Sequence, residues 1–152
     1  MQTLRVFPHD PAFFPTQDHL TMWMMTSLKA RGGTYHLISP ESRAVPAERN
    51  LDPGSIVLFR HKHHLVGEAI VRKFEKKEST TPEGQCQGVV TFVPSSIRLY
   101  SPPISVDEVQ LQIDDSLQDE TRDITNPRGY PGIKWDIYPK VLALVTKNGS
   151  LI

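Results

Sequence analysis

The pattern of hydrophobic and polar positions predicts several short strands separated by turns. The clearest pair is formed by residues 55–59 and 65–71, two runs rich in β-branched and aromatic residues that flank the polar sequence HKHH. The sequence DPG at residues 52–54 is typical of a turn before the first run. Gly67, inside the second run, indicates a bulge or a close approach of backbone. This part of the chain is therefore predicted to form a β-hairpin.

Shorter patterns predict further elements along the chain. A helix is predicted to begin after Ser105, because Glu108 follows this N-cap candidate at the spacing of a capping box. Two apolar runs fit either a buried strand or a helix, since their length does not decide between them: residues 19–28 and 135–145. The remaining strand predictions are residues 34–38, 89–93 and 97–100.

The other segments are predicted to lack regular structure. The first twenty residues are predicted to be extended, with three phenylalanines docked on the core: Phe7, Phe13 and Phe14. Segments rich in polar residues and breakers predict loops at residues 39–50, 76–88 and 114–132. Many short strands, tight turns and few helices favour a strand-dominated α+β fold with a small barrel-like or sandwiched sheet. The length of 152 residues fits one domain, 1–152.

Charge excludes one class of protein and leaves another open. The chain has 17 basic and 17 acidic residues, whereas a protein that coats nucleic acid without specificity is normally basic. The charges are uneven: residues 60–78 hold six Lys or Arg against three acids, and residues 107–123 hold seven acids against one base. Each segment fits a solvated surface, but the basic one could also border an anion-binding site.

Cysteine usage and hydropathy indicate a soluble, cytoplasmic protein. Cys86 is the only cysteine, so it cannot form an internal disulfide and a reducing compartment is expected. The N-terminal residues do not resemble a signal peptide, and no apolar run reaches the length that spans a bilayer.

The common catalytic and metal-binding patterns find no support in the sequence. His61 and His63 would share one face of a strand, but without a further ligand cluster a polar hairpin tip is the better interpretation. No GxSxG, GxGxxG or GK[ST] motif occurs. The acids at residues 107–123 lie among Ser, Gln and Thr, which favours a solvated loop over a Mg²⁺ site. We therefore predict no catalytic residue and no metal or other cofactor.

Aromatic residues spread along the chain suggest a different chemistry. Each of them fits a core position, yet together they could supply faces for stacking a nucleobase taken out of a duplex. They are Trp23, Tyr35, Phe59, Tyr100, Tyr130, Trp135 and Tyr138.

Three segments in family order, covering roughly half of the chain, resemble the EVE branch of the PUA-like domains. Residues 53–71, PGSIVLFRHKHHLVGEAIV, resemble the central hairpin, with Gly54, Phe59 and His61 at its turn, aromatic and polar positions. Residues 89–110 resemble the later strand and the start of the following helix, and TMWMMTS resembles the opening strand with its Trp. The chain departs from the family at Ser55, where Asp is usual, and at Arg60, where Tyr is usual.

The resemblance implies a PUA-like twisted, barrel-like sheet with flanking helices and a pocket for a modified base. EVE domains and the related YTH and SRA domains read altered bases in single-stranded RNA or flipped from duplex DNA. The protein is thus expected to be a non-catalytic module that binds nucleic acid, with modified DNA preferred over RNA. It is expected to act in a modification-dependent restriction system. The nuclease would be a separate partner, or would be fused to this chain as the N-terminal reader of a longer protein.

The resemblance also assigns roles to individual residues. Trp23 and Phe59 are expected to form aromatic walls, and His61 is expected to donate to the base edge. Arg60 is expected to stack on the base or to contact phosphate. Further wall candidates are Tyr35, Trp135 and Tyr138, and candidates for backbone contacts are Arg31, Lys62, Arg72 and Lys73.

Two other functions are compatible with the sequence. ASCH domains of the same superfamily include hydrolases that act on modified nucleosides or RNA, and Thr26, Lys29 and Glu68 could supply such a catalytic set. The acidic residues 107–123 could instead form a face that binds a protein partner.

Overall fold

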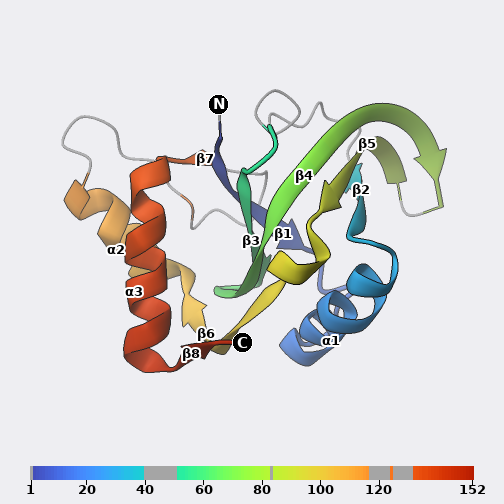
Figure 1. The fold of residues 1–152 in the computed structure, drawn as a ribbon. Helices are drawn as coiled ribbons and strands as arrows, with labels where there is room; N and C mark the ends of the chain where they lie inside the picture. Colours follow the sequence, from blue (N-terminus) through green and yellow to red (C-terminus); the bar gives the residue numbers. More distant parts are fainter. Residues whose placement is uncertain (1, 40–50, 83, 117–123, 125–131) are drawn as a thin grey trace.

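The computed structural model describes residues 2–39, 51–82, 84–116, 124 and 132–152. Within these residues the chain forms an eight-stranded sheet and three α-helices (Figure 1). The strands are β1 (Leu4–His9), β2 (Thr34–Ser39), β3 (Ile56–His61), β4 (His64–Thr81), β5 (Gly84–Phe92), β6 (Arg98–Ser105), β7 (Gly132–Ile133) and β8 (Ser150–Leu151). The helices are α1 (Gln17–Trp23), which continues as a π-helical segment (Met24–Leu28), α2 (Val106–Ser116) and α3 (Tyr138–Asn148). The predicted strand-dominated α+β class is confirmed.

The predicted barrel-like sheet is not formed: within the described residues the sheet is open and is not closed into a barrel. Its main path runs β2-β5-β4-β3-β1-β7, and β6 pairs with both β4 and β8. Strand β1 is parallel to β3, and the other pairs are antiparallel. The parallel pair requires a crossover, which α1 and β2 supply between the two strands.

The two faces of the sheet carry separate hydrophobic cores. Side chains alternate between the faces along each strand, so Phe7 and Phe59 face one side while Val6 and Leu58 face the other. We call the first the α1 core, because Leu20, Met24 and Leu28 pack into it from α1 and its π-helical extension. The second is the α3 core, to which α2 and α3 contribute Val106, Val109, Ile113, Val141 and Val145.

Both ambiguous apolar runs are helical, and the match of TMWMMTS to an opening strand is wrong. Leu20, Met24 and Leu28 are fully buried at a spacing of four residues, which places them on one side of a helix. Thr16 caps this helix, because its hydroxyl accepts a hydrogen bond of 3.2 Å from the backbone N–H of His19. The opening strand is β1 instead.

The predicted hairpin at residues 55–71 is confirmed, including the role of Gly67. A Cβ on Gly67 would lie 2.4 Å from the carbonyl oxygen of Arg98, so β6 approaches the backbone at this point. The predicted N-cap is also confirmed, since the Ser105 hydroxyl accepts a 3.1 Å hydrogen bond from the Asp107 N–H.

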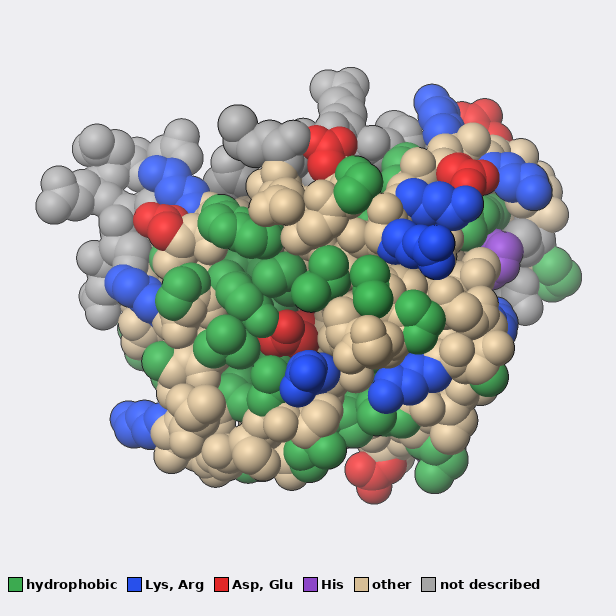
Figure 2. Space-filling model, in the orientation of Figure 1, with side chains coloured by type: hydrophobic (Ala, Val, Ile, Leu, Met, Phe, Trp, Pro, Cys, Tyr) green, Lys and Arg blue, Asp and Glu red, His purple; other side chains and the backbone are tan. Residues whose placement is uncertain are grey.

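The loop predicted at residues 76–88 is wrong. Strand β4 continues to Thr81 and β5 begins at Gly84, so the two form a long hairpin that curves away from the helices (Figure 1). Its outer part carries exposed Lys and Glu side chains on a paired backbone, which hides the hydrophobic alternation that normally identifies a strand. Figure 2 shows Lys and Arg side chains gathered over this hairpin.

Other predictions lie partly or wholly outside the described residues. The loop predicted at residues 39–50 lies outside the described residues except for Ser39, which ends β2. The loop predicted at residues 114–132 is wrong at its start, because α2 continues to Ser116. The acidic segment 107–123, expected to be a solvated loop, is likewise helical as far as Ser116, and its residues 117–123 lie outside the described residues. Among the helices that the structure describes, none is both long enough and apolar enough to cross a bilayer.

Candidate functional site

A cluster of aromatic rings lies where the C-terminal ends of β1 and β3 meet α1 and the start of β2. His9 stacks on Phe59 with ring centroids 5.3 Å apart, and Tyr35 meets His9 edge-on at 5.8 Å. Phe14 and Trp23 meet edge-on at 5.5 Å, and Trp23 is 5.9 Å from Tyr35. We call these five residues, together with His61, the aromatic site: His9, Phe14, Trp23, Tyr35, Phe59 and His61.

The parallel pairing of β1 with β3 explains why these side chains converge. Phe7 lies opposite Phe59 and His9 lies opposite His61 in the register, so all four project from the same face of the sheet. A turn after β1 then brings Phe14 over His9, at a centroid distance of 5.6 Å.

His9 is held in one tautomer by two hydrogen bonds. Its Nδ1 lies 3.1 Å from the backbone oxygen of Arg60, which can only accept, so Nδ1 carries the proton. Its Nε2 is therefore an acceptor, and the Tyr35 hydroxyl donates to it at 2.9 Å. Burial lowers the pKa of His9 to about 4. The imidazole is consequently neutral near pH 7 and orients the Tyr35 ring.

His61 is buried beside this pair and has a nitrogen free to accept a hydrogen bond. Its Nε2 lies 2.6 Å from the carbonyl oxygen of Phe14, so Nε2 is the protonated nitrogen. In the neutral imidazole Nδ1 is then a lone-pair acceptor, and Nδ1 has no hydrogen-bond partner in the described part of the chain. A buried acceptor without a partner is costly, which makes it a natural contact for the donor of a ligand.

Phe14 and Trp23 form the side of the aromatic site that reaches solvent. Both are half-buried, whereas His9, Phe59 and His61 are buried. The guanidinium of Arg31 lies 5.5 Å from the centre of the Trp23 ring, a cation–π distance. This exposed arginine places a positive charge at the rim of the aromatic site.

The structure brings together only part of the predicted base-binding set. Trp23, Tyr35, Phe59 and His61 belong to the aromatic site. Arg60 is buried with its side chain on the α3 side, where it donates 2.6 Å hydrogen bonds to the backbone oxygens of Lys62 and Ile124. These bonds give it a structural role.

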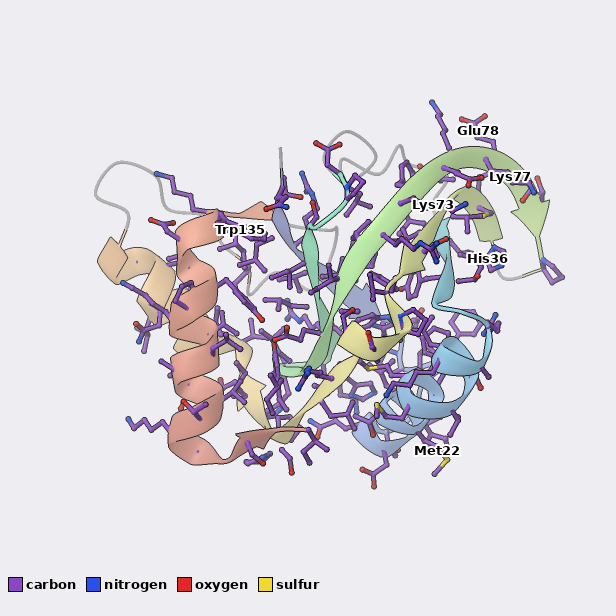
Figure 3. The ribbon with its side chains drawn as sticks, viewed as in Figure 1. Met22, His36, Lys73, Lys77, Glu78 and Trp135 are labelled. Atoms are coloured by element: carbon purple, nitrogen blue, oxygen red, sulfur yellow. The ribbon has the colours of Figure 1, made fainter. Side chains whose placement is uncertain are left out.

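Trp135 and Tyr138 lie on the opposite face, beside α3 (Figure 3). The predicted backbone-contact residues are all exposed, but only Arg31 adjoins the aromatic site. Lys62 occupies the tip of the β3–β4 hairpin with a φ of 52°, and Arg72 and Lys73 lie on the long part of β4.

A second polar cluster lies in the α3 core around Glu68. This buried carboxylate accepts hydrogen bonds from the hydroxyls of Tyr100 at 2.9 Å and Tyr138 at 2.5 Å. Burial and the neighbouring Glu68 carboxylate raise the pKa of Tyr100 well above its usual value, and the pKa of Tyr138 is raised for the same reasons. Thr26 and Lys29 lie on the α1 side, so the sheet separates them from Glu68 and the predicted hydrolase set is not assembled.

The Glu68 cluster makes the fold sensitive to alkali. Above pH 10 the unfolded chain loses its phenolic protons while the folded chain keeps that of Tyr100, so the free energy of unfolding falls by about 1.4 kcal/mol per pH unit for this group. The free energy of unfolding of Tyr100→Phe, measured with urea between pH 9 and 11, should fall less steeply with pH than that of the wild type, and the slopes should differ by this amount. Curves that stay parallel to the wild type above pH 10 would contradict the assignment.

Sequence reasoning missed His9 and Phe14. Both lie in the first twenty residues, where Phe14 was predicted only to dock on the core. The docking of Phe7 and Phe14 is confirmed, whereas that of Phe13 is wrong, because its side chain is 54% exposed. The only signal for β1 is its apolar residues Leu4, Val6 and Phe7, because nearly all of its positions are buried and no alternation marks it as a strand.

The arrangement offers flat apolar faces, one fixed acceptor nitrogen and a cation at the rim. No group of three or more metal-ligating side chains comes together among the described residues. The sequence matches no family model and no curated protein.

Proposed function

We propose that the protein is a non-catalytic nucleic-acid-binding module that takes one modified nucleobase into the aromatic site. The observation that carries this proposal is the buried Nδ1 of His61, an acceptor without a partner in the described chain, among stacked aromatic rings. A nucleobase combines the two complementary features, a flat π-face and N–H donors on its edge.

The geometry reverses the role that the resemblance implies for His61. Because its Nε2 proton is used by the Phe14 carbonyl, His61 accepts from the base instead of donating to it. An exocyclic amine or the hydroxyl of a hydroxymethyl group can make this bond. Stacking on Trp23 and Phe14 contributes about 1–3 kcal/mol per base.

The fold and the rim charge support a PUA-like, EVE-like reader. A β-hairpin next to a parallel first strand, with helices on both faces, is compatible with that superfamily although the sheet is open. Arg31 is placed to contact a phosphate next to the bound base, and Lys62, Arg72 and Lys73 would contact the backbone farther away. We propose that the ligand is modified DNA in preference to RNA. The nuclease of the system would be a separate or fused partner.

A binding panel at fixed moderate salt tests the proposal. The panel holds single- and double-stranded DNA and RNA, each plain or with methylcytosine, hydroxymethylcytosine or methyladenine. We expect a preference of about ten-fold or more, about 1.4 kcal/mol, for one modification. Equal binding to every member would contradict the reader function.

Trp23→Ala is expected to reduce the preference for the modified base about ten-fold or more, because one stacking face is lost. Trp135→Ala is the matched control, since it removes an exposed tryptophan on the other face of the sheet. It should leave the preference unchanged. The same panel measures both variants, and equal effects of the two would place the base elsewhere.

A further inference from the structure

Two exposed hydrophobic side chains adjoin the solvent side of the aromatic site. Phe13 is 54% exposed and precedes the wall residue Phe14, and Met22 is 68% exposed and precedes the wall residue Trp23. The rings of Phe14 and Trp23 are 5.5 Å apart, so both exposed residues flank the solvent side of the aromatic site. Figure 3 shows Met22 pointing from α1 away from the sheet.

The exposed position of Phe13 is fixed by hydrogen bonds on both sides of it. The backbone oxygen of Asp10 accepts from the N–H groups of Phe13 and Phe14, both at 3.0 Å, and the Asp10 carboxylate accepts from Ala12 N–H at 2.8 Å. The Phe14 carbonyl in turn accepts from His61. Phe14 is therefore turned inward and Phe13 outward by one rigid turn.

A rigid, exposed ring beside a base-binding site suits one particular ligand. A base in a duplex reaches such a site only after it leaves the stack, and the gap that it leaves exposes the apolar faces of its neighbours. Aromatic and aliphatic side chains fill gaps of this kind as wedges between base steps. Single strands have no such gap, so a wedge would bring them little.

We propose that Phe13 is a wedge that enters duplex DNA at the position from which the base is extruded into the aromatic site. This inference rests on the proposed function and deepens it, because it names the duplex as the substrate. The pre-formed turn holds the ring in place before binding, so little conformational freedom is lost when the ring inserts. The guanidinium of Arg31, 5.5 Å from the Trp23 ring centre, provides a positive charge that attracts the phosphates next to the extruded base.

The test compares duplex and single-stranded probes with the full-length chain. The probes are oligonucleotides with methylcytosine, hydroxymethylcytosine, methyladenine or no modification, each as a duplex and as a single strand. Phe13→Ala should weaken binding to the preferred duplex at least ten-fold and binding to the matching single strand less than two-fold. Phe13→Tyr should retain the wild-type affinities, because it keeps the ring.

Leu111→Ala is the matched control, since Leu111 is 60% exposed on α2. It should leave all affinities unchanged, and circular dichroism checks that each variant is folded. A second readout uses 2-aminopurine next to the modified base, whose fluorescence rises when stacking is broken. Phe13→Ala should reduce this rise.

The possible results separate the wedge from the reader function. Equal effects of Phe13→Ala on duplex and single strand, or no effect on either, would overturn the wedge while the preference of the wild type for one modification stands. A wild type that binds all probes alike would overturn the reader function, and the wedge with it.

Discussion

Lowering the pH from 7 to 4 is expected to reduce the free energy of unfolding by about 3 kcal/mol through His9 alone. Burial lowers its pKa from 6.5 to about 4, and each unit of this difference corresponds to about 1.4 kcal/mol. Between these two values the unfolded chain binds a proton that the folded chain does not bind, so stability falls as the pH falls. The contribution is fully present above pH 6.5 and fully lost below pH 4.

Urea unfolding of the wild type and of His9→Gln from pH 7 to pH 4 measures the contribution of His9 to the free energy of unfolding. The variant should be less stable at pH 7, because the bond from Tyr35 is altered, but its stability should fall less steeply with decreasing pH. His36→Gln is the control for losing an imidazole, since His36 is exposed on β2. Parallel curves for wild type and His9→Gln would show that His9 is not buried as described.

Elements with strong local patterns could be predicted from the sequence. The hairpin at residues 55–71 consists of two runs rich in β-branched and aromatic residues around a polar tip, and the cap at Ser105 is a local spacing, so both were predicted correctly. The outer part of the β4–β5 hairpin has no such pattern. The exposed side chains of β4 there are polar on both faces, and the strands are held by backbone pairing such as Thr81 with Gly84 and Lys76 with Gly88, which leaves no hydrophobic periodicity in the sequence.

The aromatic site could be predicted only in part for a similar reason. Trp23, Phe59 and His61 were predicted from the resemblance, although the segment that carries Trp23 is a helix and not the expected strand. His9 entered the site through the parallel register of β1 with β3, which joins segments about fifty residues apart. Trp135 and Tyr138 were included because an aromatic residue alone carries no information on which face of a sheet it lies.

Gly33→Ala is expected to destabilise the fold by about 2–5 kcal/mol. Gly33 joins the end of the π-helical segment to β2: its N–H donates to Leu28 at 2.9 Å and its oxygen accepts from Phe92 at 2.8 Å. Its φ is +81°, which costs an L-residue about 1–2 kcal/mol. An added Cβ would also lie 2.1 Å from the Phe92 oxygen, and relieving such overlap costs about 1–3 kcal/mol more.

The neighbouring Gly32 separates these two causes. Its φ is +67°, but a Cβ there would meet no atom within 4 Å, so Gly32→Ala should cost only the strain of about 1–2 kcal/mol. The free energies of unfolding of the two variants, measured with urea at pH 7, should therefore differ by the overlap cost of about 1–3 kcal/mol. Because Tyr35 follows Gly33 by two residues, Gly33→Ala should also weaken base binding, whereas Gly32→Ala should not. Equal losses of stability would show that β5 does not press on Gly33, and the placement of Tyr35 in the aromatic site would then need another cause.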